Sequence, residues 1–349
     1  MMQRTVLLIA IGLVLGGPAD IAVAAESKPA QFYSSAGILK WMNSYRSKPD
    51  PLRAADAIHE LSSLGELRNP ESVGVYLGFA AGILAANPDK DDELAARMLP
   101  MSAEDQWLVV RAIAYSGVPR WHFVLTNIRR RVPARDAMVK RYLVGLLPVL
   151  SQYRLEGPKP GWWAHIGEHL PFAAKPAVKP VILEPSPELL DTFWGYYYAT
   201  GARMPVQNII GMLAWSTNKD DVDKLTLGGM AKYTLASNAS RDPALLAMIK
   251  SMQPSEPKEV GSVLKDVIEA ADDVDVSRIR REMLASLNNL ERKGPQSRRD
   301  ISLWGQVGEG ALAVGCIAAA VAGQVQFGIP CVVGGAVSSG GLQLWSSQN

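Results

Sequence analysis

The sequence predicts an all-α protein, and three of its features support this fold class. Apolar residues recur at intervals of three and four along most of the chain, as on one face of a helix. Proline, glycine and Asn-Pro steps interrupt this pattern at helix-length intervals. Alternating strand patterns are nearly absent. With 48% hydrophobic residues, 20% charged residues and a net charge of +2, the composition is that of a globular protein and gives no indication of nucleic-acid binding.

The first residues have the three parts of a cleavable secretory signal. Arg4 precedes an apolar run over 6–15, a Gly-Gly-Pro break follows it, and small residues occupy 22–24. Signal peptidases cleave after small residues of this kind. We therefore expect residues 1–24 to be removed and the mature chain to work in the periplasm or outside the cell. Its remaining length of about 325 residues predicts two packed regions.

The helical pattern defines these regions as 30–153 and 188–293. In the first we predict helices over 32–46, 51–64, 71–86, 91–99, 103–115, 121–131 and 134–153. In the second we predict helices over 188–199, 206–215, 220–237, 243–252, 258–271 and 276–292. Ser102 and Ser186 each precede acidic first-turn residues. Both are predicted caps, because the hydroxyl accepts from a free amide and the acids oppose the helix dipole.

A proline-rich crossover at 154–187 separates the two regions. Its seven prolines prevent a long helix. Its apolar residues, Trp162 and Trp163 among them, predict a strap packed across the helices rather than a floppy linker. The crossover is therefore a candidate boundary between two regions of limited independence.

Three segments are alike in outline as helix-turn-helix units. Each has a helix with small residues that ends at Asn87-Pro88, Ser116-Gly117 or Thr200-Gly201, where glycine or Asn-Pro stops the helix. In this outline the chain resembles the αα repeat families, tetratricopeptide-like or Sel1-like, over roughly two thirds of its length. The resemblance implies an irregular αα-hairpin repeat array, an α-solenoid-like stack with a concave binding face.

Aromatic residues are the first candidates for binding. On the helix predicted at 188–199, Trp194, Tyr197 and Tyr198 follow helical spacing and are expected in the core. Tyr196 points elsewhere and is the candidate recognition platform of this helix, together with Trp162 or Trp163 from the crossover.

A dense block of basic residues is the second candidate. Arg129, Arg130 and Arg131 lie within a block that runs from Arg120 to Arg141. This positive charge could dock an acidic partner or an anionic lipid, although charge runs are more often solvated helix faces.

The sharpest catalytic motif is formed by His165, Glu168 and His169, in the H-x-x-E-H pattern of the inverted zinc peptidases. Two histidines four apart on a helix share one face and could bind zinc, while the glutamate activates a water. Nearby glycines and Pro171 allow barely two helical turns, which favours histidines without a metal. We therefore expect no cofactor.

The segment at 305–345 is apolar and rich in glycine and alanine. Small residues recur every four positions at its start, which lets helices pack closely. A helical hairpin, membrane insertion through 308–342 and self-association are three alternatives. The hairpin is favoured because it places Cys316 and Cys331 opposite one another. In an oxidising compartment these cysteines are expected to form a disulfide, with two buried thiols as the alternative.

These features predict an exported helical-repeat binding or scaffold protein of the cell envelope, without enzymatic activity, whose partner is another envelope protein or component. A zinc-dependent envelope hydrolase using His165, Glu168 and His169 is the first alternative. A membrane-associated assembly protein inserted through its C-terminal segment is the second.

Overall fold

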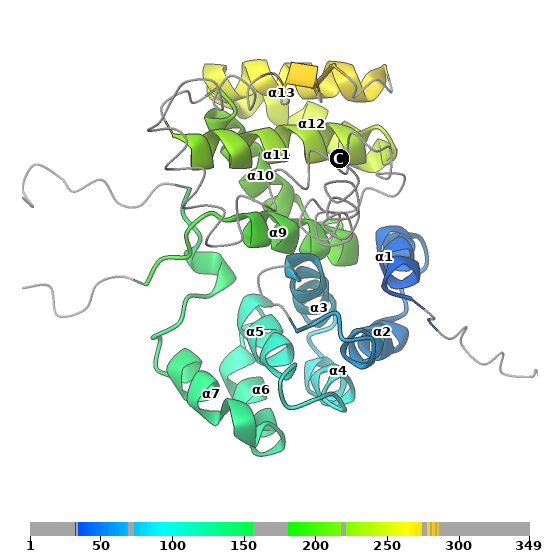
Figure 1. Cartoon of the computed structure of the whole chain (residues 1–349), viewed down its shortest axis with the longest axis vertical. Coiled ribbons are helices and arrows are strands. Elements are labelled where there is room, and N and C mark those ends of the chain that lie inside the picture. Colours follow the sequence, from blue (N-terminus) through cyan, green and yellow to red (C-terminus); the bar gives the residue numbers. More distant parts are fainter. Residues whose placement is uncertain are drawn as a thin grey trace, which may run out of the picture. The chain divides into compact units, whose positions relative to one another are not determined.

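Helices account for the regular structure of the chain in a computed structural model (Figure 1). The structure describes residues 32, 34–68, 73–155, 181–217 and 221–273, with 278, 279, 281, 282 and 285. Within these residues there is no strand, and Tyr153 and Leu183 form an isolated parallel bridge at the two ends of the crossover. The all-α prediction is confirmed. The predicted signal, most of the crossover and the segment 305–345 lie outside the described residues.

The helices before the crossover follow one another through short turns. They are α1 (Ser35–Ser44), α2 (Pro51–Ser63), α3 (Gly74–Ala86), α4 (Asp91–Met98), α5 (Trp107–Tyr115), α6 (Trp121–Ile128) and α7 (Asp136–Leu143), with 3-10 turns η1 (Tyr45–Ser47), η3 (Arg129–Arg131), η4 (Pro133–Arg135) and η5 (Leu150–Gln152). Side-chain caps define where α1 and α2 begin. Ser34 accepts a hydrogen bond from the amide of Gly37, and Asp50 accepts one from the amide of Arg53, as N-caps do.

The helices after the crossover are longer on average and carry the clearest caps. They are α9 (Pro187–Thr200), α10 (Arg203–Met212), α11 (Val222–Ala239), α12 (Pro243–Met252) and α13 (Lys258–Asp272), with 3-10 turns η6 (Leu213–Trp215) and η7 (Gln253–Ser255). The predicted cap at Ser186 is confirmed, because its hydroxyl accepts from the amide of Leu189 at 3.1 Å. Asp242 caps α12 in the same way, with Pro243 at the first helical position, where its missing N–H costs nothing.

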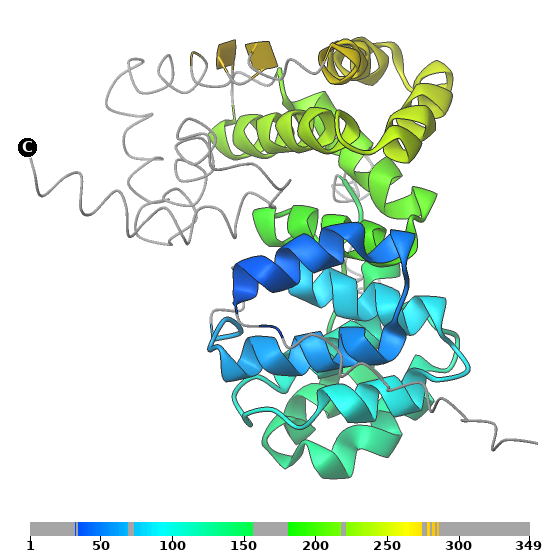
Figure 2. The same cartoon turned by 90° about the vertical axis from the view of Figure 1, so that its right-hand side faces the viewer.

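The central feature of the fold is the packing of α3 against α9. Nearly every residue of both helices is buried. This is expected for α3, which is apolar all round, whereas α9 also buries the polar residues Asp191 and Thr192. Gly74, Gly78 and Gly82 form one face of α3, and Gly195 faces them from α9. A Cβ atom built on Gly78 would lie 1.8 Å from the carbonyl oxygen of Thr192. Since no side chain fits there, the two backbones are in direct contact, as Figures 1 and 2 show for the neighbouring ribbons.

The remaining helices pack on both sides of this pair. Helices two apart in the sequence lie together, α2 with α4, α3 with α5, α4 with α6 and α5 with α7, and later α10 with α12 and α11 with α13. One continuous cluster of buried side chains runs through both groups. The helices before and after the crossover therefore share a core.

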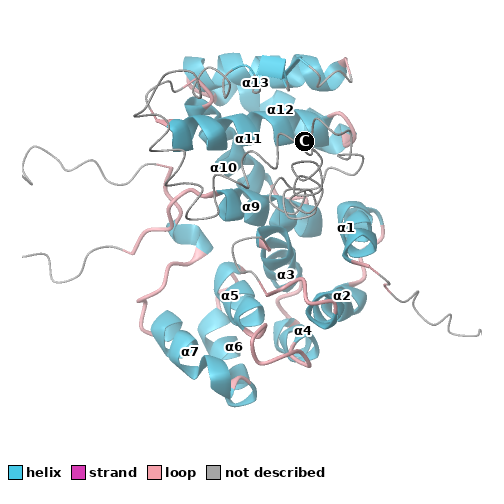
Figure 3. Ribbon diagram, viewed as in Figure 1, coloured by secondary structure: helices cyan, strands magenta, loops and turns pink. Residues whose placement is uncertain are grey.

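Several observed helices are shorter than predicted, and two of them show the physical reason. Helix α5 begins at Trp107, and Ser102 is not its cap. The carboxylate of Asp105 instead accepts a hydrogen bond from the hydroxyl of Ser62 on α2 at 2.6 Å, so tertiary bonding replaces the first helical turn. The predicted helix 134–153 ends near 143, because Gly145 adopts a φ of +73°, the left-handed conformation that ends helices. A loop follows α7 as a result (Figure 3).

Candidate functional site

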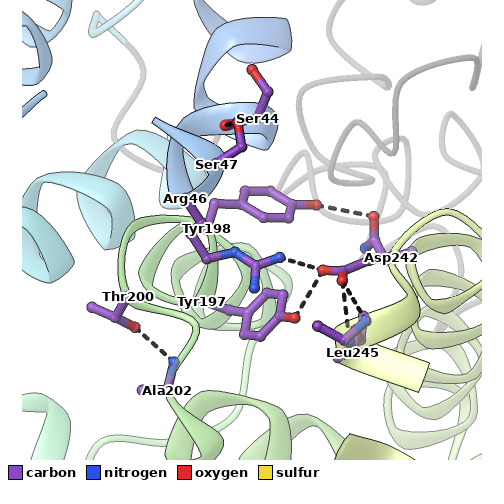
Figure 4. A network of polar contacts seen from close by, with 11 residues as sticks. Ser44, Arg46, Ser47, Tyr197, Tyr198, Thr200, Ala202, Asp242 and Leu245 are labelled. Atoms are coloured by element: carbon purple, nitrogen blue, oxygen red, sulfur yellow. Dashed lines mark hydrogen bonds and ion pairs between the residues drawn. The ribbon is translucent and has the colours of Figure 1, made fainter. Parts of the chain in front are cut away.

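A pocket of about 230 Å³ lies where α1, the end of α9 and the turn from α11 to α12 come together. It is lined by Lys40, Asn43, Ser44, Arg46, Tyr197, Tyr198, Asn238, Arg241, Asp242 and Pro243. Figure 4 shows the polar network that forms its wall. Because the three segments are far apart in the sequence, only the folded chain assembles this site.

Asp242 is the centre of the network. Its Oδ1 accepts hydrogen bonds from the amides of Ala244 and Leu245, both at 3.1 Å. Its Oδ2 accepts one from the hydroxyl of Tyr197 at 2.9 Å and is ion-paired with Arg46. A carboxylate has about four acceptor positions. All four are used here, so Asp242 is fixed in place and its charge is compensated.

Arg46 joins η1 to α9 and α12. Its guanidinium lies 4.3 Å from the ring centroid of Tyr197, a distance at which the ring face attracts a cation. Beside it, the hydroxyl of Tyr198 donates to Oδ1 of Asn238 at 3.1 Å. The buried Nε of Arg46 has no hydrogen-bond partner in the described part of the chain. The polar side chains of the wall are therefore bonded to one another.

The protonation states follow from these contacts. Burial acts to raise the pKa of Asp242, but hydrogen bonds from Leu245 and Tyr197 and the charge of Arg46 outweigh it and lower the pKa below its ordinary value. Burial raises the pKa of both Tyr197 and Tyr198. At neutral pH, Asp242 is thus charged and both phenols stay protonated. The lining residues include three cations, Lys40, Arg46 and Arg241, and one carboxylate, that of Asp242.

Tyr196 is not the exposed platform that its position on the helix predicted. Only 8% of it is exposed, and its hydroxyl donates to the carbonyl oxygen of Ser116 at 3.0 Å. The reason is that α9 is covered on all sides, so no face of this helix is left for solvent. The expectation that Trp194, Tyr197 and Tyr198 are buried is confirmed.

The basic block is largely used inside the fold. Arg120 pairs with the buried carboxylate of Asp91, and Arg129 and Lys140 both pair with Asp136. The hydrogen bonds from Arg129 and Lys140 lower the pKa of Asp136 to about 2. Arg130 and Arg131 are exposed. The predicted docking role of Arg129, Arg130 and Arg131 stays a prediction, carried mainly by the latter two.

Several predicted site residues lie outside the described residues. They are Trp162, Trp163, His165, Glu168, His169, Cys316 and Cys331. In the part that the structure describes, no group of three or more His, Cys, Asp or Glu side chains could hold a metal ion. No helix of that part is long and apolar enough to span a bilayer.

The sequence patterns did not identify the pocket residues, and the reason is physical. Arg46 and Asp242 are 196 positions apart. Taken locally, Arg46 lies in the turn after one helix and Asp242 is the N-cap of another, and neither position indicates a function. Tyr197 and Tyr198 follow the core pattern because their rings are in the core while their hydroxyls reach the pocket. The one local signal is the pair Asp242-Pro243, which marks a helix start and no function.

The site belongs to an all-α protein with a polar, positively charged pocket between helices. No protein-family model matches the sequence, and neither a curated protein nor a solved structure is significantly similar to it. The function of the protein is therefore inferred from its residues and their arrangement.

Proposed function

We propose that the chain is an exported, non-enzymatic binding or scaffold protein of the cell envelope, and that the pocket between α1, α9 and α12 holds part of its partner. The observation that carries this proposal is the pocket wall. Arg46, Tyr197 and Asp242 are locked to one another by complementary bonds, and pre-ordered polar groups of this kind favour binding because little entropy is lost on association.

The arrangement of the helices supports the finer proposal of an irregular αα repeat array. In stacked repeats, each helix packs on the one two positions later in the sequence. The pairs α2 with α4, α3 with α5, α4 with α6 and α5 with α7 follow this rule, and so do α10 with α12 and α11 with α13. The extensive contact between α3 and α9 departs from it and joins two short arrays back to back.

The proposed export is supported by the sequence at 1–24, with its basic residue, apolar run and small residues before the cleavage point. The partner is proposed to be another envelope protein or an envelope component. The test is a pull-down from envelope extract with the tagged mature chain, 25–349. Enrichment of one envelope protein, reduced by Asp242→Ala, supports the proposal. Capture of cytoplasmic proteins alone contradicts it.

The zinc alternative makes a different prediction. If His165, Glu168 and His169 form a hydrolase site, the purified mature chain holds one zinc ion, and His165→Ala loses it. Metal analysis of both proteins decides between an enzyme and a binding protein without knowledge of the substrate.

A further inference from the structure

We propose that the exposed side of α6 and α7 rests against an anionic phospholipid surface. This side, the α6–α7 surface, is formed by the apolar residues Phe123, Val144 and Leu146 and the cations Arg130, Arg131 and Arg141. It lies on other helices than the pocket. The inference rests on the proposed function and deepens it, since it names a lipid surface as an envelope component that the chain contacts.

Positive charge is concentrated in the segment that forms these two helices. Residues 117–150 contain seven Lys and Arg residues and one acid, Asp136. The whole chain has 36 Lys and Arg and 34 Asp and Glu, so 29 basic and 33 acidic residues are left for the rest of it. A chain that is nearly neutral overall therefore has one strongly basic part, and such a part attracts an anionic partner.

Three of these cations are not used inside the fold. Arg130, Arg131 and Arg141 are exposed. Arg129 and Lys140 are held in ion pairs, whereas these three form none within the described part of the chain. A phosphate headgroup can therefore bind them without breaking an existing ion pair, and arginine binds phosphate oxygens through strong, charge-assisted hydrogen bonds.

Apolar side chains are exposed on the same two helices. Among the described residues, the three most exposed large hydrophobic side chains are Val144 at 67%, Phe123 at 55% and Leu146 at 55%. One such residue alone is ordinary, but three of them beside a basic cluster indicate an interaction site. A purely anionic partner would leave them in water. A lipid surface accommodates both kinds of side chain, because its headgroups attract the cations and its acyl boundary takes up the apolar groups.

Helical geometry brings the two kinds of side chain together. Phe123 on α6 and Arg130 in η3 are seven residues apart, which is close to two helical turns. At the end of α7, Arg141 and Val144 are three residues apart and are neighbours on the helix surface. Both helices pack on α5 and on each other (Figure 1), so their exposed sides both lie away from α5. Each helix therefore presents a cation near an apolar side chain on its outer side.

Co-sedimentation of the mature chain with lipid vesicles tests the inference. One set of vesicles contains phosphatidylglycerol and phosphatidylcholine in equal parts, and the other contains phosphatidylcholine alone. We expect the wild type to bind the anionic vesicles and to bind the neutral ones far less. The triple variant Arg130→Gln/Arg131→Gln/Arg141→Gln should weaken anionic binding by about a hundredfold, since each cation beside an anionic surface contributes roughly fivefold.

A matched control removes three positive charges elsewhere. Lys48, Arg203 and Lys258 are exposed and lie outside α6 and α7. The variant Lys48→Gln/Arg203→Gln/Lys258→Gln should bind within a few fold of the wild type, because only screened long-range charge is lost. If the arginine triple variant does not fold, Arg130→Gln/Arg131→Gln gives the same comparison, with an expected loss of about twentyfold.

A second pair of variants tests the apolar contribution. Val144→Ser/Leu146→Ser should weaken binding to anionic vesicles at least about tenfold, because two side chains no longer leave water. The control is Leu52→Ser/Met204→Ser, which changes two exposed apolar residues on α2 and α10 and should leave binding unchanged. If both pairs bind like the wild type, the lipid surface is wrong, since charge alone would then explain the attraction.

Three further outcomes overturn the inference. The first is no binding of the wild type to anionic vesicles, and the second is equal weakening in the two charge variants. The third is binding to neutral and anionic vesicles alike that the arginine variant does not change, because the membrane contact then comes from another segment such as 305–345. An acidic protein captured through the three arginines, without vesicle binding, identifies a different occupant and also overturns it.

The lipid surface and the envelope role fail separately. Vesicle binding that depends on the three arginines, together with a pull-down that yields only cytoplasmic proteins, retains the lipid surface and removes the envelope role. An envelope protein captured equally by the wild type and by the arginine variant, with no binding to vesicles, retains the envelope role and removes the lipid surface.

Discussion

Replacing Gly78 by alanine should strongly destabilise the protein, because it forces apart the two central helices. The new Cβ would lie 1.8 Å from the carbonyl oxygen of Thr192, and 2.6 Å and 2.8 Å from its carbonyl carbon and Cα. Ordinary contact begins near 3.4 Å, so α3 and α9 would have to separate by about 1.6 Å. The obstructing atoms are backbone and cannot move by a change of rotamer.

The magnitude follows from two opposing effects. Alanine favours the helix over glycine by about 0.8–1.0 kcal/mol. Separation of the helices costs more, because overpacking typically costs about 1–3 kcal/mol and the widened interface also loses close dispersion contacts along its length. We expect the free energy of unfolding to fall by about 2–4 kcal/mol for Gly78→Ala. At about 1.5 °C per kcal/mol for a chain of about 325 residues, the Tm should fall by about 3–6 °C.

The assay is urea denaturation followed by circular dichroism, with Gly261→Ala as the matched control. Gly261 lies inside α13, where the atoms nearest to an added Cβ are 3.8 Å away, so this variant should gain up to about 1 kcal/mol. If Gly78→Ala is as stable as Gly261→Ala, the direct backbone contact between α3 and α9 is refuted.

A milder pair of variants covers the case in which Gly78→Ala does not fold. A Cβ on Gly82 would meet the Cβ of Ala199 at 2.6 Å, a side-chain atom that can be removed. Gly82→Ala should be destabilising, and Ala199→Gly should recover part of the loss in the double variant. A coupling energy near zero in this cycle would contradict the predicted contact.

Two further predictions concern buried polar groups. Thr234→Val should lower the free energy of unfolding by about 1–3 kcal/mol, because Nε1 of the buried Trp194 donates to the Thr234 hydroxyl at 3.0 Å and would lose its acceptor; thermal melting checks this. Asp242→Asn should cost about 2 kcal/mol at pH 7 through loss of the pair with Arg46. Folding lowers the pKa of Asp242. Its contribution to the free energy of unfolding is therefore complete above the pKa of about 4 in the unfolded chain and disappears as the pH falls through the pKa in the folded protein. Urea titrations of the wild type and of Asp242→Asn should give the same stability in acid.

Each of these predictions has its own control. Thr126→Val removes an exposed hydroxyl whose hydrogen-bond partner among the described residues is the carbonyl oxygen of His122, and it should change stability by less than about 0.5 kcal/mol. A Thr234→Val variant that melts like Thr126→Val would show that the Trp194 bond contributes nothing. For Asp242, a stability difference from the asparagine variant that stays constant down to pH 2 would contradict the lowered pKa.

Local patterns were enough to predict much of the secondary structure. The helix at 243–252 and the cap at Ser186 depend on residues within one turn, since capping and helical periodicity act over three or four positions. Where long-range contacts competed, local prediction was wrong. Asp105 bonds to Ser62 instead of opening α5, and Tyr196 is covered although its position suggested exposure.

The sequence by itself determined the all-α class, most helix positions, and the presence of small residues that permit close helix packing. It did not determine the partner of each helix. The glycines of α3 were compatible with a neighbour in the same hairpin, yet they pack against α9, and Arg46 meets Asp242 across 196 positions. Such pairing depends on the complementary shape of whole helix faces. The pocket therefore exists only in the tertiary structure, because it is the place where three separately predicted helical segments meet.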